Sequence, residues 1–343
     1  MHDNESGPAR DDVIKGTDDD ATVSRLSAVD LGYLDDPYVK HFVKRASRRP
    51  PIINRGTFLR THALDTLVEN FIQQSSDCKL KRQIVSLGAG SDTRYFKFKR
   101  KGLAVDKYFE IDFAESTTKK AMTIKKHKDL MDVLQGQQVR LGMGGTELYA
   151  DDYCLLAADL REFELEVLPK LKAQGFDTSL PTLFLSECVL IYLQPQDSDA
   201  IVEWISKTMR AALFVLYEQI QPSDAFGAMM VRNLKARQIE IPGIYAYPSL
   251  ESQEQRFLSR GWKAAKAVDM NSLQTEYLSP AEMERLSRLE IFDEVEEWQM
   301  LAAHYCVAWA HRVQQSSGTA QDANDAALLS SIDNMFAAVV QEK

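Results

Sequence analysis

The sequence has few of the features that mark metal sites, hydrolases or membrane spans. Its four cysteines are widely scattered, at Cys78, Cys154, Cys188 and Cys306. Without a CxxC pair, neither a disulfide framework nor a cysteine zinc site is expected. The six histidines lack HxxxH and HxH spacing, and no GxSxG motif occurs, which disfavours a histidine metal site and hydrolase chemistry. No run approaches the roughly 18 apolar residues that a membrane span requires.

An excess of positive charge is also missing. The chain has 41 lysine and arginine residues against 50 aspartate and glutamate residues, a net charge of −9, which argues against a general affinity for nucleic acid. Residues 1–21 hold many aspartates and almost no large apolar side chains, so we expect them to be disordered and not to form a secretory signal. The default expectation is a cytoplasmic monomer that binds neither membranes nor nucleic acid.

What the chain does contain is an alternation of helical stretches and short apolar runs. Apolar residues recur at helical spacing over 57–72. Buried strands are then expected at 83–87, 108–113, 154–159, 182–186, 213–217, 263–268 and 305–310. Helices are expected near 115–126, 161–172, 196–209 and 280–289. This alternation predicts a doubly wound α/β fold with a seven-stranded, mostly parallel sheet.

The expected domain organisation has three parts. An α/β domain at 22–312 follows the disordered segment, and residues 313–343 form a linker and a short C-terminal helix. A helical insertion at about 223–261 separates the fifth and sixth strands. Ligands of open α/β sheets bind at the carboxyl ends of the strands. We therefore expect this insertion and the helical N-terminal part to lie over that edge as lid insertions.

A glycine-rich turn follows the first expected strand. Gly88 and Gly90 flank Ala89, and two glycines allow a sharp turn and a close approach of the backbone to a ligand. The dinucleotide fingerprint GxGxxG requires a third glycine where Thr93 stands, which weakens a nicotinamide interpretation. Taken alone, the turn fits a structural role as well as a ligand loop.

Acidic residues mark the ends of the next three strands. Asp112 could accept both ribose hydroxyls of an adenosine group, and it could at the same time cap the following helix. Asp159, with Leu160, suits the amine and the face of an adenine, although Asp159 could also be a cap. Glu187 ends an apolar run and needs a cationic partner, either a ligand sulfonium or ammonium group or an internal arginine. Together with the glycines, these acids predict an S-adenosylmethionine pocket at one edge of the sheet.

Two basic segments flank these features. Arg55 and Arg60 lie around a helix start, and Arg60 could clamp the carboxylate of the cofactor bidentately or form a surface ion pair. Residues 94–101 interleave arginines and lysines with aromatic residues. We expect this basic run to be a solvated face, with a landing site for an acidic partner as the alternative.

In combination, these motifs resemble the leucine carboxyl methyltransferases. The matching stretches follow the family order from about residue 25 to 312: Gly32-Tyr33, Asp36-Pro37-Tyr38, Ile53-Asn54-Arg55-Gly56, Leu87-Gly88-Ala89-Gly90, Asp92-Thr93, Tyr108-Phe109-Glu110-Ile111-Asp112-Phe113, Leu180-Pro181-Thr182, Glu187-Cys188-Val189-Leu190, Tyr217-Glu218-Gln219, Gly261-Trp262, Ala267-Val268-Asp269-Met270 and His304-Tyr305-Cys306. The resemblance implies a Rossmann-like class I fold and S-adenosylmethionine as cofactor. It also implies cofactor contacts at Arg60, Gly88, Asp112, Asp159, Leu160 and Glu187. The resemblance also implies a cofactor contact at Arg25, where the family has a lysine. The positive charge is the same, but the geometry of the side chain differs.

The resemblance further implies methyl-ester formation on the C-terminal leucine of the catalytic subunit of type 2A protein phosphatase. A C-terminal carboxylate has an unperturbed pKa of roughly 3.5 and is already ionised at neutral pH. We therefore expect no catalytic acid, base or metal, and transfer by positioning and desolvation. Tyr192 and Tyr217, near the ends of the fourth and fifth strands, are expected to hold the incoming carboxylate.

Other functions remain open on the sequence. The related tRNA-wybutosine methyltransferases carry a kelch-repeat extension, and no such repeat occurs here, which favours a protein acceptor. One alternative is a small-molecule carboxylate O-methyltransferase with the same core. Another is a non-catalytic scaffold that docks on the phosphatase, although a scaffold has no need for intact glycines and carboxylates.

Overall fold

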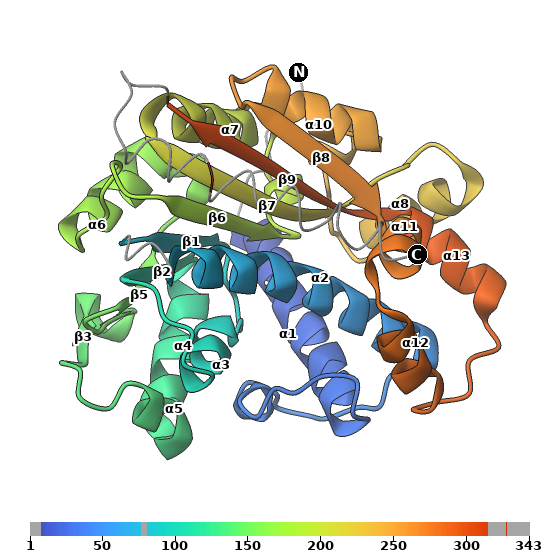
Figure 1. The fold of residues 1–343 in the computed structure, drawn as a ribbon, viewed down its shortest axis with the longest axis horizontal. Helices are drawn as coiled ribbons and strands as arrows, with labels where there is room; N and C mark the ends of the chain where they lie inside the picture. The colour runs from blue at the N-terminus through green and yellow to red at the C-terminus, as the bar shows by residue number, and fades with distance from the viewer. Residues whose placement is uncertain (1–7, 77–80, 315–326, 328–343) are drawn as a thin grey trace.

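The fold is built on one mixed β-sheet with helices on both faces. The computed structural model describes residues 8–76, 81–314 and 327 (Figure 1). The sheet has nine strands in the order β3-β4-β5-β2-β1-β6-β7-β9-β8. Their bounds are β1 Gln83–Leu87, β2 Lys107–Asp112, β3 Arg140–Gly142, β4 Glu147–Tyr149, β5 Tyr153–Ala157, β6 Thr182–Glu187, β7 Ala211–Gln219, β8 Ala264–Asp269 and β9 Tyr305–Val313.

The central strands run parallel and are buried on both faces. β5, β2, β1, β6 and β7 are neighbours in that order, with parallel pairing throughout. Every residue of β1, β5 and β7 is buried. This burial explains why these segments are continuous apolar runs in the sequence rather than alternating patterns. The predicted doubly wound class and its five central strands are confirmed.

Two groups of helices cover the sheet (Figure 1). One face packs against α2 (Pro51–Ser76), α3 (Arg94–Arg100) and α4 (Ala114–Lys126). The other face packs against α6 (Leu168–Ala173), α7 (Pro195–Thr208) and α10 (Leu250–Leu258). The remaining helices are α1 (Pro8–Asp30), α5 (Lys128–Val133), α8 (Ala225–Ala236), α9 (Gly243–Ala246), α11 (Met270–Ser272), α12 (Pro280–Ser287) and α13 (Val295–Ala303). Because both faces are covered, a ligand can reach the sheet at its carboxyl edge.

The sheet has two strands more than the seven predicted. β4 pairs antiparallel with β5, and β3 pairs antiparallel with β4. Each has three residues, too few to give a periodic apolar pattern, and β3 lies at the edge of the sheet. The expected helix at 161–172 is also irregular. It begins as a 3-10 turn at Leu160–Glu162, continues as a π-helical turn at Phe163–Val167 and ends as α6.

Residues 8–21 are helical, in contrast to the disorder expected from their composition. They form the first part of α1, and their acidic and basic side chains bond to distant parts of the fold. Asp11 pairs with Arg161 at 2.8 Å, and Lys15 pairs with Glu115 at 2.8 Å. Val13 packs against the apolar cluster that contains Ile191 and Ile241, and the ion pairs add to this small apolar contact.

The insertion at 223–261 is helical as expected and contains α8, α9 and α10. Only its last helix joins the layer on the sheet, where Phe257 of α10 enters the apolar core. Val313 ends β9, and the linker and C-terminal helix expected at 313–343 otherwise lie almost wholly outside the described residues. None of the helices in the described ranges is long and apolar enough to cross a membrane.

Candidate active site

A cavity of about 700 Å³ opens at the carboxyl ends of the parallel strands. The ten residues predicted to bind the cofactor or the substrate all line it: Arg25, Arg60, Gly88, Gly90, Asp112, Asp159, Leu160, Glu187, Tyr192 and Tyr217. Helix α1 contributes ten lining residues, whereas the described part of the 223–261 insertion contributes Arg237 alone. The wall over the strand ends is therefore mainly the N-terminal helix.

The glycine turn forms the floor of the cavity and needs its glycines. Gly88 has φ +66° and Gly90 has φ +46°, a region that disfavours residues with a side chain. A Cβ at Gly88 would lie 2.5 Å from a methyl carbon of Val189, and one at Gly90 would overlap a carboxylate oxygen of Asp18. Asp18 also accepts a hydrogen bond from the Ser91 backbone at 2.9 Å, so α1 is fastened directly to this turn.

Substituting Gly88 by alanine should destabilise the protein more than the same change at Gly102. Gly102 has φ +77°, and a Cβ added there would meet no atom within 4 Å, so Gly102→Ala reports the backbone strain alone. At Gly88 the contact with Val189 adds overpacking, and we expect about 1–3 kcal/mol of additional destabilisation. Urea unfolding of both variants measures this difference. Equal losses in the two variants would show that the turn is not packed against Val189.

Asp112 ties the glycine turn to the neighbouring strand. Its side chain accepts hydrogen bonds from the backbone nitrogens of Gly90 and Phe113, both at 2.7 Å. Burial raises the pKa of Asp112 above its ordinary value, against the effect of these hydrogen bonds. The interpretation of Asp112 as a helix cap is wrong, because Phe113 is the N-cap of α4 and makes no side-chain cap. Its contact with the ribose stays a prediction.

Asp159 serves as a helix cap, which was one of its two expected roles. Its carboxylate accepts a hydrogen bond from the Arg161 backbone at 2.9 Å and pairs with the guanidinium of the same arginine at 2.5 Å. Arg161 also pairs with Asp11 of α1. Leu160 is buried beside it and lines the cavity. Their contact with an adenine stays a prediction.

Glu187 is held by internal arginines. Its carboxylate accepts a hydrogen bond from Arg60 Nε and another from Arg94 Nη1 at 2.6 Å, and Arg25 Nη2 lies 3.8 Å away. Burial alone would raise the pKa of Glu187, but the three arginines outweigh it and hold this pKa well below its ordinary value. Glu187 is therefore ionised at neutral pH. Arg60 pairs with this buried carboxylate and not with a surface acid.

Arg94 and Asp92 belong to the site and were missed in the sequence. Arg94 is fully buried and bonds to three carboxylates, those of Asp65 at 2.6 Å, Asp92 at 2.8 Å and Glu187 at 2.6 Å. Arg25 Nη1 reaches Asp92 at 3.5 Å. The sequence did offer a signal for Arg94: it directly follows Asp92-Thr93 and is the first residue of the helix after the glycine turn.

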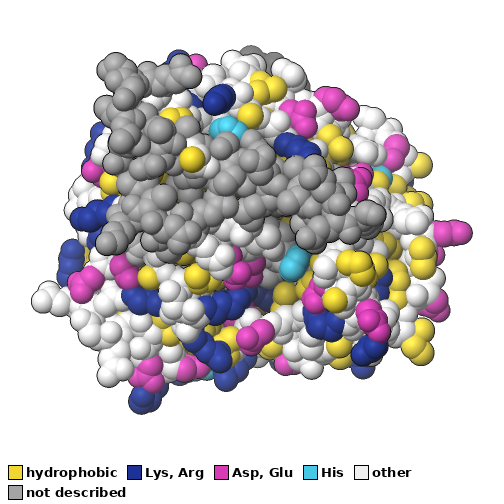
Figure 2. Space-filling view, in the orientation of Figure 1, with side chains coloured by type: hydrophobic (Ala, Val, Ile, Leu, Met, Phe, Trp, Pro, Cys, Tyr) yellow, Lys and Arg dark blue, Asp and Glu magenta, His cyan; other side chains and the backbone are white. Residues whose placement is uncertain are grey.

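The expectation of a solvated basic face at 94–101 is thus wrong for its first half. Arg94 and Lys97 are buried, and Lys97 pairs with Asp65 at 2.7 Å. The interleaved aromatic residues, Tyr95, Phe96 and Phe98, belong to the apolar core. On the molecular face in Figure 2, lysines and arginines lie next to aspartates and glutamates instead of forming one basic patch.

The far end of the cavity is aromatic and apolar. The rings of Tyr217 and Tyr305 stack with centroids 5.5 Å apart, and the Arg60 guanidinium lies 4.9 Å from the Tyr217 ring centroid. Burial raises the pKa of Tyr192 and of Tyr217 well above the ordinary value, so both hydroxyls stay protonated and can donate. Apolar lining at this end comes from Met270, Trp298, Leu301 and Ala302.

The residues present fit S-adenosylmethionine. The volume lies within the roughly 300–1,000 Å³ range of small-molecule pockets. The glycine turn at Gly88 and Gly90 lines the floor of the cavity. Ionised Glu187 and the adjacent Arg60 can pair with an ammonium and a carboxylate respectively. Asp112, Asp159 and Leu160 lie along the same wall from the ends of β2 and β5. S-adenosylmethionine carries an ammonium, a carboxylate and an adenosine group, and each of these groups has a suitable side chain in this cavity.

Comparison with known proteins supports the same conclusion. The family model for leucine carboxyl methyltransferases matches residues 14–206. The leucine carboxyl methyltransferase 1 homolog of Arabidopsis thaliana is 45% identical over 302 residues, covering 87% of this chain and 89% of that protein. Leucine carboxyl methyltransferase 1 of Rattus norvegicus is 38% identical, with 90% and 92% covered.

Two further comparisons concern the length of the match and the fold. The tRNA wybutosine-synthesizing protein 4 of Homo sapiens is 38% identical over 90% of this chain but 45% of its own length. A crystal structure of a DUF574 family protein from Streptomyces avermitilis has a TM-score of 0.50 and 12% identity, and covers 85% of this chain and 97% of that protein. The chain therefore belongs to the leucine carboxyl methyltransferase family, and its cofactor is S-adenosylmethionine.

Proposed function

We propose that this protein methylates the α-carboxylate of the C-terminal leucine of the type 2A protein phosphatase catalytic subunit. The observation that carries the proposal is the cavity with two unlike ends. One end has the glycine turn and the strand-end acids, and the other has the stacked tyrosines with Met270, Trp298 and Leu301. An acceptor with an apolar side chain and a terminal carboxylate suits the second end. The family relationship supports the same acceptor.

In the proposed mechanism, the protein orients two charged reactants and excludes water. S-adenosylmethionine supplies an electrophilic methyl group on a sulfonium. Glu187 and Arg60 would hold the charged amino-acid part of the cofactor, and Asp112 would hold its ribose. Tyr192 and Tyr217 donate hydrogen bonds to the acceptor carboxylate. Because opposite charges cancel during the displacement, a pocket that removes water from both reactants favours the transfer.

No side chain needs to remove a proton in this mechanism. The acceptor carboxylate has an unperturbed pKa of roughly 3.5 and is ionised in neutral solution. Glu187, with its pKa held well below the ordinary value by Arg60 and Arg94, is a very weak base. The two tyrosines, with raised pKa values, act as donors.

The rate of methyl transfer is therefore expected to be flat between about pH 6 and 8, measured with saturating cofactor and acceptor. Glu110, whose pKa burial raises to about 7, could titrate in this range. It does not line the cavity, and it pairs with Lys120 at 2.6 Å beneath the site. A loss of rate toward pH 6 that disappears when a cavity-lining side chain is replaced would contradict the mechanism.

Transfer of a labelled methyl group separates the proposed function from its alternatives. The enzyme is incubated with methyl-labelled S-adenosylmethionine and one of three acceptors: intact phosphatase, phosphatase without its last leucine, or a panel of free carboxylic acids. The proposal predicts label on intact phosphatase alone. Label on the free acids with none on the phosphatase would identify a small-molecule enzyme. Cofactor binding without transfer to any acceptor would favour a docking scaffold.

A further inference from the structure

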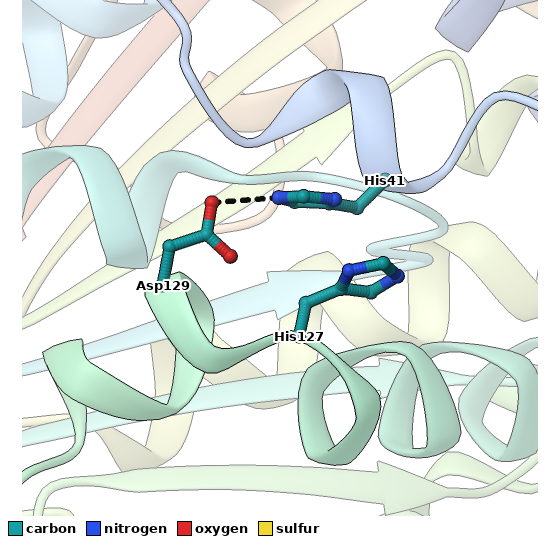
Figure 3. A group of neighbouring side chains, drawn as sticks. All are labelled: His41, His127 and Asp129. Carbon is teal, nitrogen blue, oxygen red and sulfur yellow. Dashed lines mark hydrogen bonds and ion pairs between the residues drawn. The ribbon is translucent and has the colours of Figure 1, made fainter.

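We propose that His41, His127 and Asp129 form a binding site for a divalent transition-metal ion such as Zn²⁺ (Figure 3). The site joins two segments that are far apart in the sequence. His41 ends the 3-10 turn Val39–His41, which follows α1. His127 is the single residue between α4 and α5, and Asp129 lies in the first turn of α5. None of the three lines the cofactor cavity.

The three side chains converge on one point. His41 Nε2 lies 2.7 Å from Asp129 Oδ2, and the two imidazole rings face each other with centroids 4.0 Å apart and an interplanar angle of 27°. One ligating atom from each side chain lies within 4.8 Å of the other two. Figure 3 shows the histidine rings one above the other, with the Asp129 carboxylate directed toward His41.

This set of donor atoms selects the class of metal. Two imidazole nitrogens and one carboxylate oxygen suit Zn²⁺, Co²⁺ or Ni²⁺. Zn²⁺ binds such nitrogen and oxygen ligands at about 2.0–2.2 Å. Mg²⁺ and Ca²⁺ prefer oxygen ligands and are not expected. A bound ion would draw the three atoms closer than they are now. A carboxylate that is 44% exposed can make this adjustment by side-chain rotation and leaves room for a water ligand.

The contact between His41 and Asp129 favours metal binding, whereas the local charge opposes it. His41 Nε2 and Asp129 Oδ2 are hydrogen-bonded at 2.7 Å, and a metal ion bound by both atoms would replace this hydrogen bond. Lys40 and Lys126 repel any cation, which further disfavours ions that bind imidazole weakly.

A metal ion here would fasten the segment after α1 to the start of α5. The 3-10 turn at Val39–His41 packs near α1, and α1 forms much of the cavity wall and carries Arg25. The ion would therefore stabilise the N-terminal part of the fold. It would take no part in methyl transfer.

Cobalt binding to the whole protein tests this site directly. Purified protein is stripped with a chelator and titrated with Co²⁺, whose visible absorption spectrum reports nitrogen and oxygen ligands. The proposal predicts one saturable Co²⁺ site that Zn²⁺ displaces and Mg²⁺ does not. His127→Asn and Asp129→Asn should each weaken binding by more than about tenfold, the effect that loss of outer-shell partners can already produce.

Asp132→Asn is the matched control, because Asp132 lies on the same helix and pairs with Lys128 instead of the histidines. This variant should bind Co²⁺ as the unaltered protein does. The absence of a saturable site, or a site that persists in both His127→Asn and Asp129→Asn, would overturn the proposal. Circular dichroism of the metal-free variants verifies that each is folded. The result does not depend on methyl transfer, so it stands or falls separately from the proposed function.

Discussion

Replacing Arg94 by methionine is expected to lower the free energy of unfolding by about 3–5 kcal/mol, as for other broken buried ion pairs. Methionine has a similar length and fills much of the same space. It leaves Asp65, Asp92 and Glu187 without the cation that all three share. The carboxylates would repel each other in a buried setting, where uncompensated charge is costly. Chemical denaturation at neutral pH measures the loss.

Two further variants show whether the effect comes from burial and geometry. Lys101→Met removes a cation from the end of the same helix. Lys101 is 50% exposed and pairs with Glu69 at the surface. We therefore expect the free energy of unfolding to fall by only about 0–1 kcal/mol. Arg94→Lys keeps the charge and loses the branched geometry that reaches three acids, so it should fall between the two. A loss at Arg94→Met no larger than at Lys101→Met would contradict the account of this ion network.

Replacing Glu187 by glutamine is expected to weaken S-adenosylmethionine binding by about 10–100-fold, equivalent to one charge-assisted hydrogen bond. The shape of the side chain is kept and its charge is lost. Arg60 and Arg94 then lose their shared carboxylate, and the ammonium group of the cofactor loses its proposed partner. Titration calorimetry with the cofactor alone measures the dissociation constant without any acceptor.

Glu69→Gln is the control for this change. Glu69 lies on α2 and pairs with Lys101 at the surface, so its substitution should leave the dissociation constant unaltered. Denaturation of both variants shows whether they remain folded at the temperature of the titration. An unchanged dissociation constant in folded Glu187→Gln would mean that Glu187 serves the arginines alone and has no part in holding the cofactor.

The parallel core of the fold could be predicted because each of its strands is buried along almost its whole length. β1 has the bounds expected from the sequence, 83–87, and the other four differ by a few residues. β3 and β4 could not be predicted, because three residues carry no periodic signal. The first part of α1 was also missed. Its contacts, such as Asp11 with Arg161, join residues 150 positions apart, and no local window of sequence contains them.

The position of the site was predictable, whereas its internal pairing was not. Parallel strands end at a common edge, so Asp112, Asp159 and Glu187 had to lie together once the strands were assigned. The partner of Glu187 depends on which side of α3 faces inward. Residues 94–101 mix basic and aromatic side chains, and this composition alone allows Arg94 to face either the solvent or the core.

The central claim, methyl-ester formation on a C-terminal carboxylate, is tested most directly by the chemical stability and location of the transferred methyl group. Phosphatase labelled by this protein with methyl-labelled S-adenosylmethionine is treated with mild base and, in parallel, digested to isolate its C-terminal peptide. The account predicts label in that peptide alone and its complete release as methanol by base. Base-stable label, or label elsewhere in the phosphatase, would contradict it.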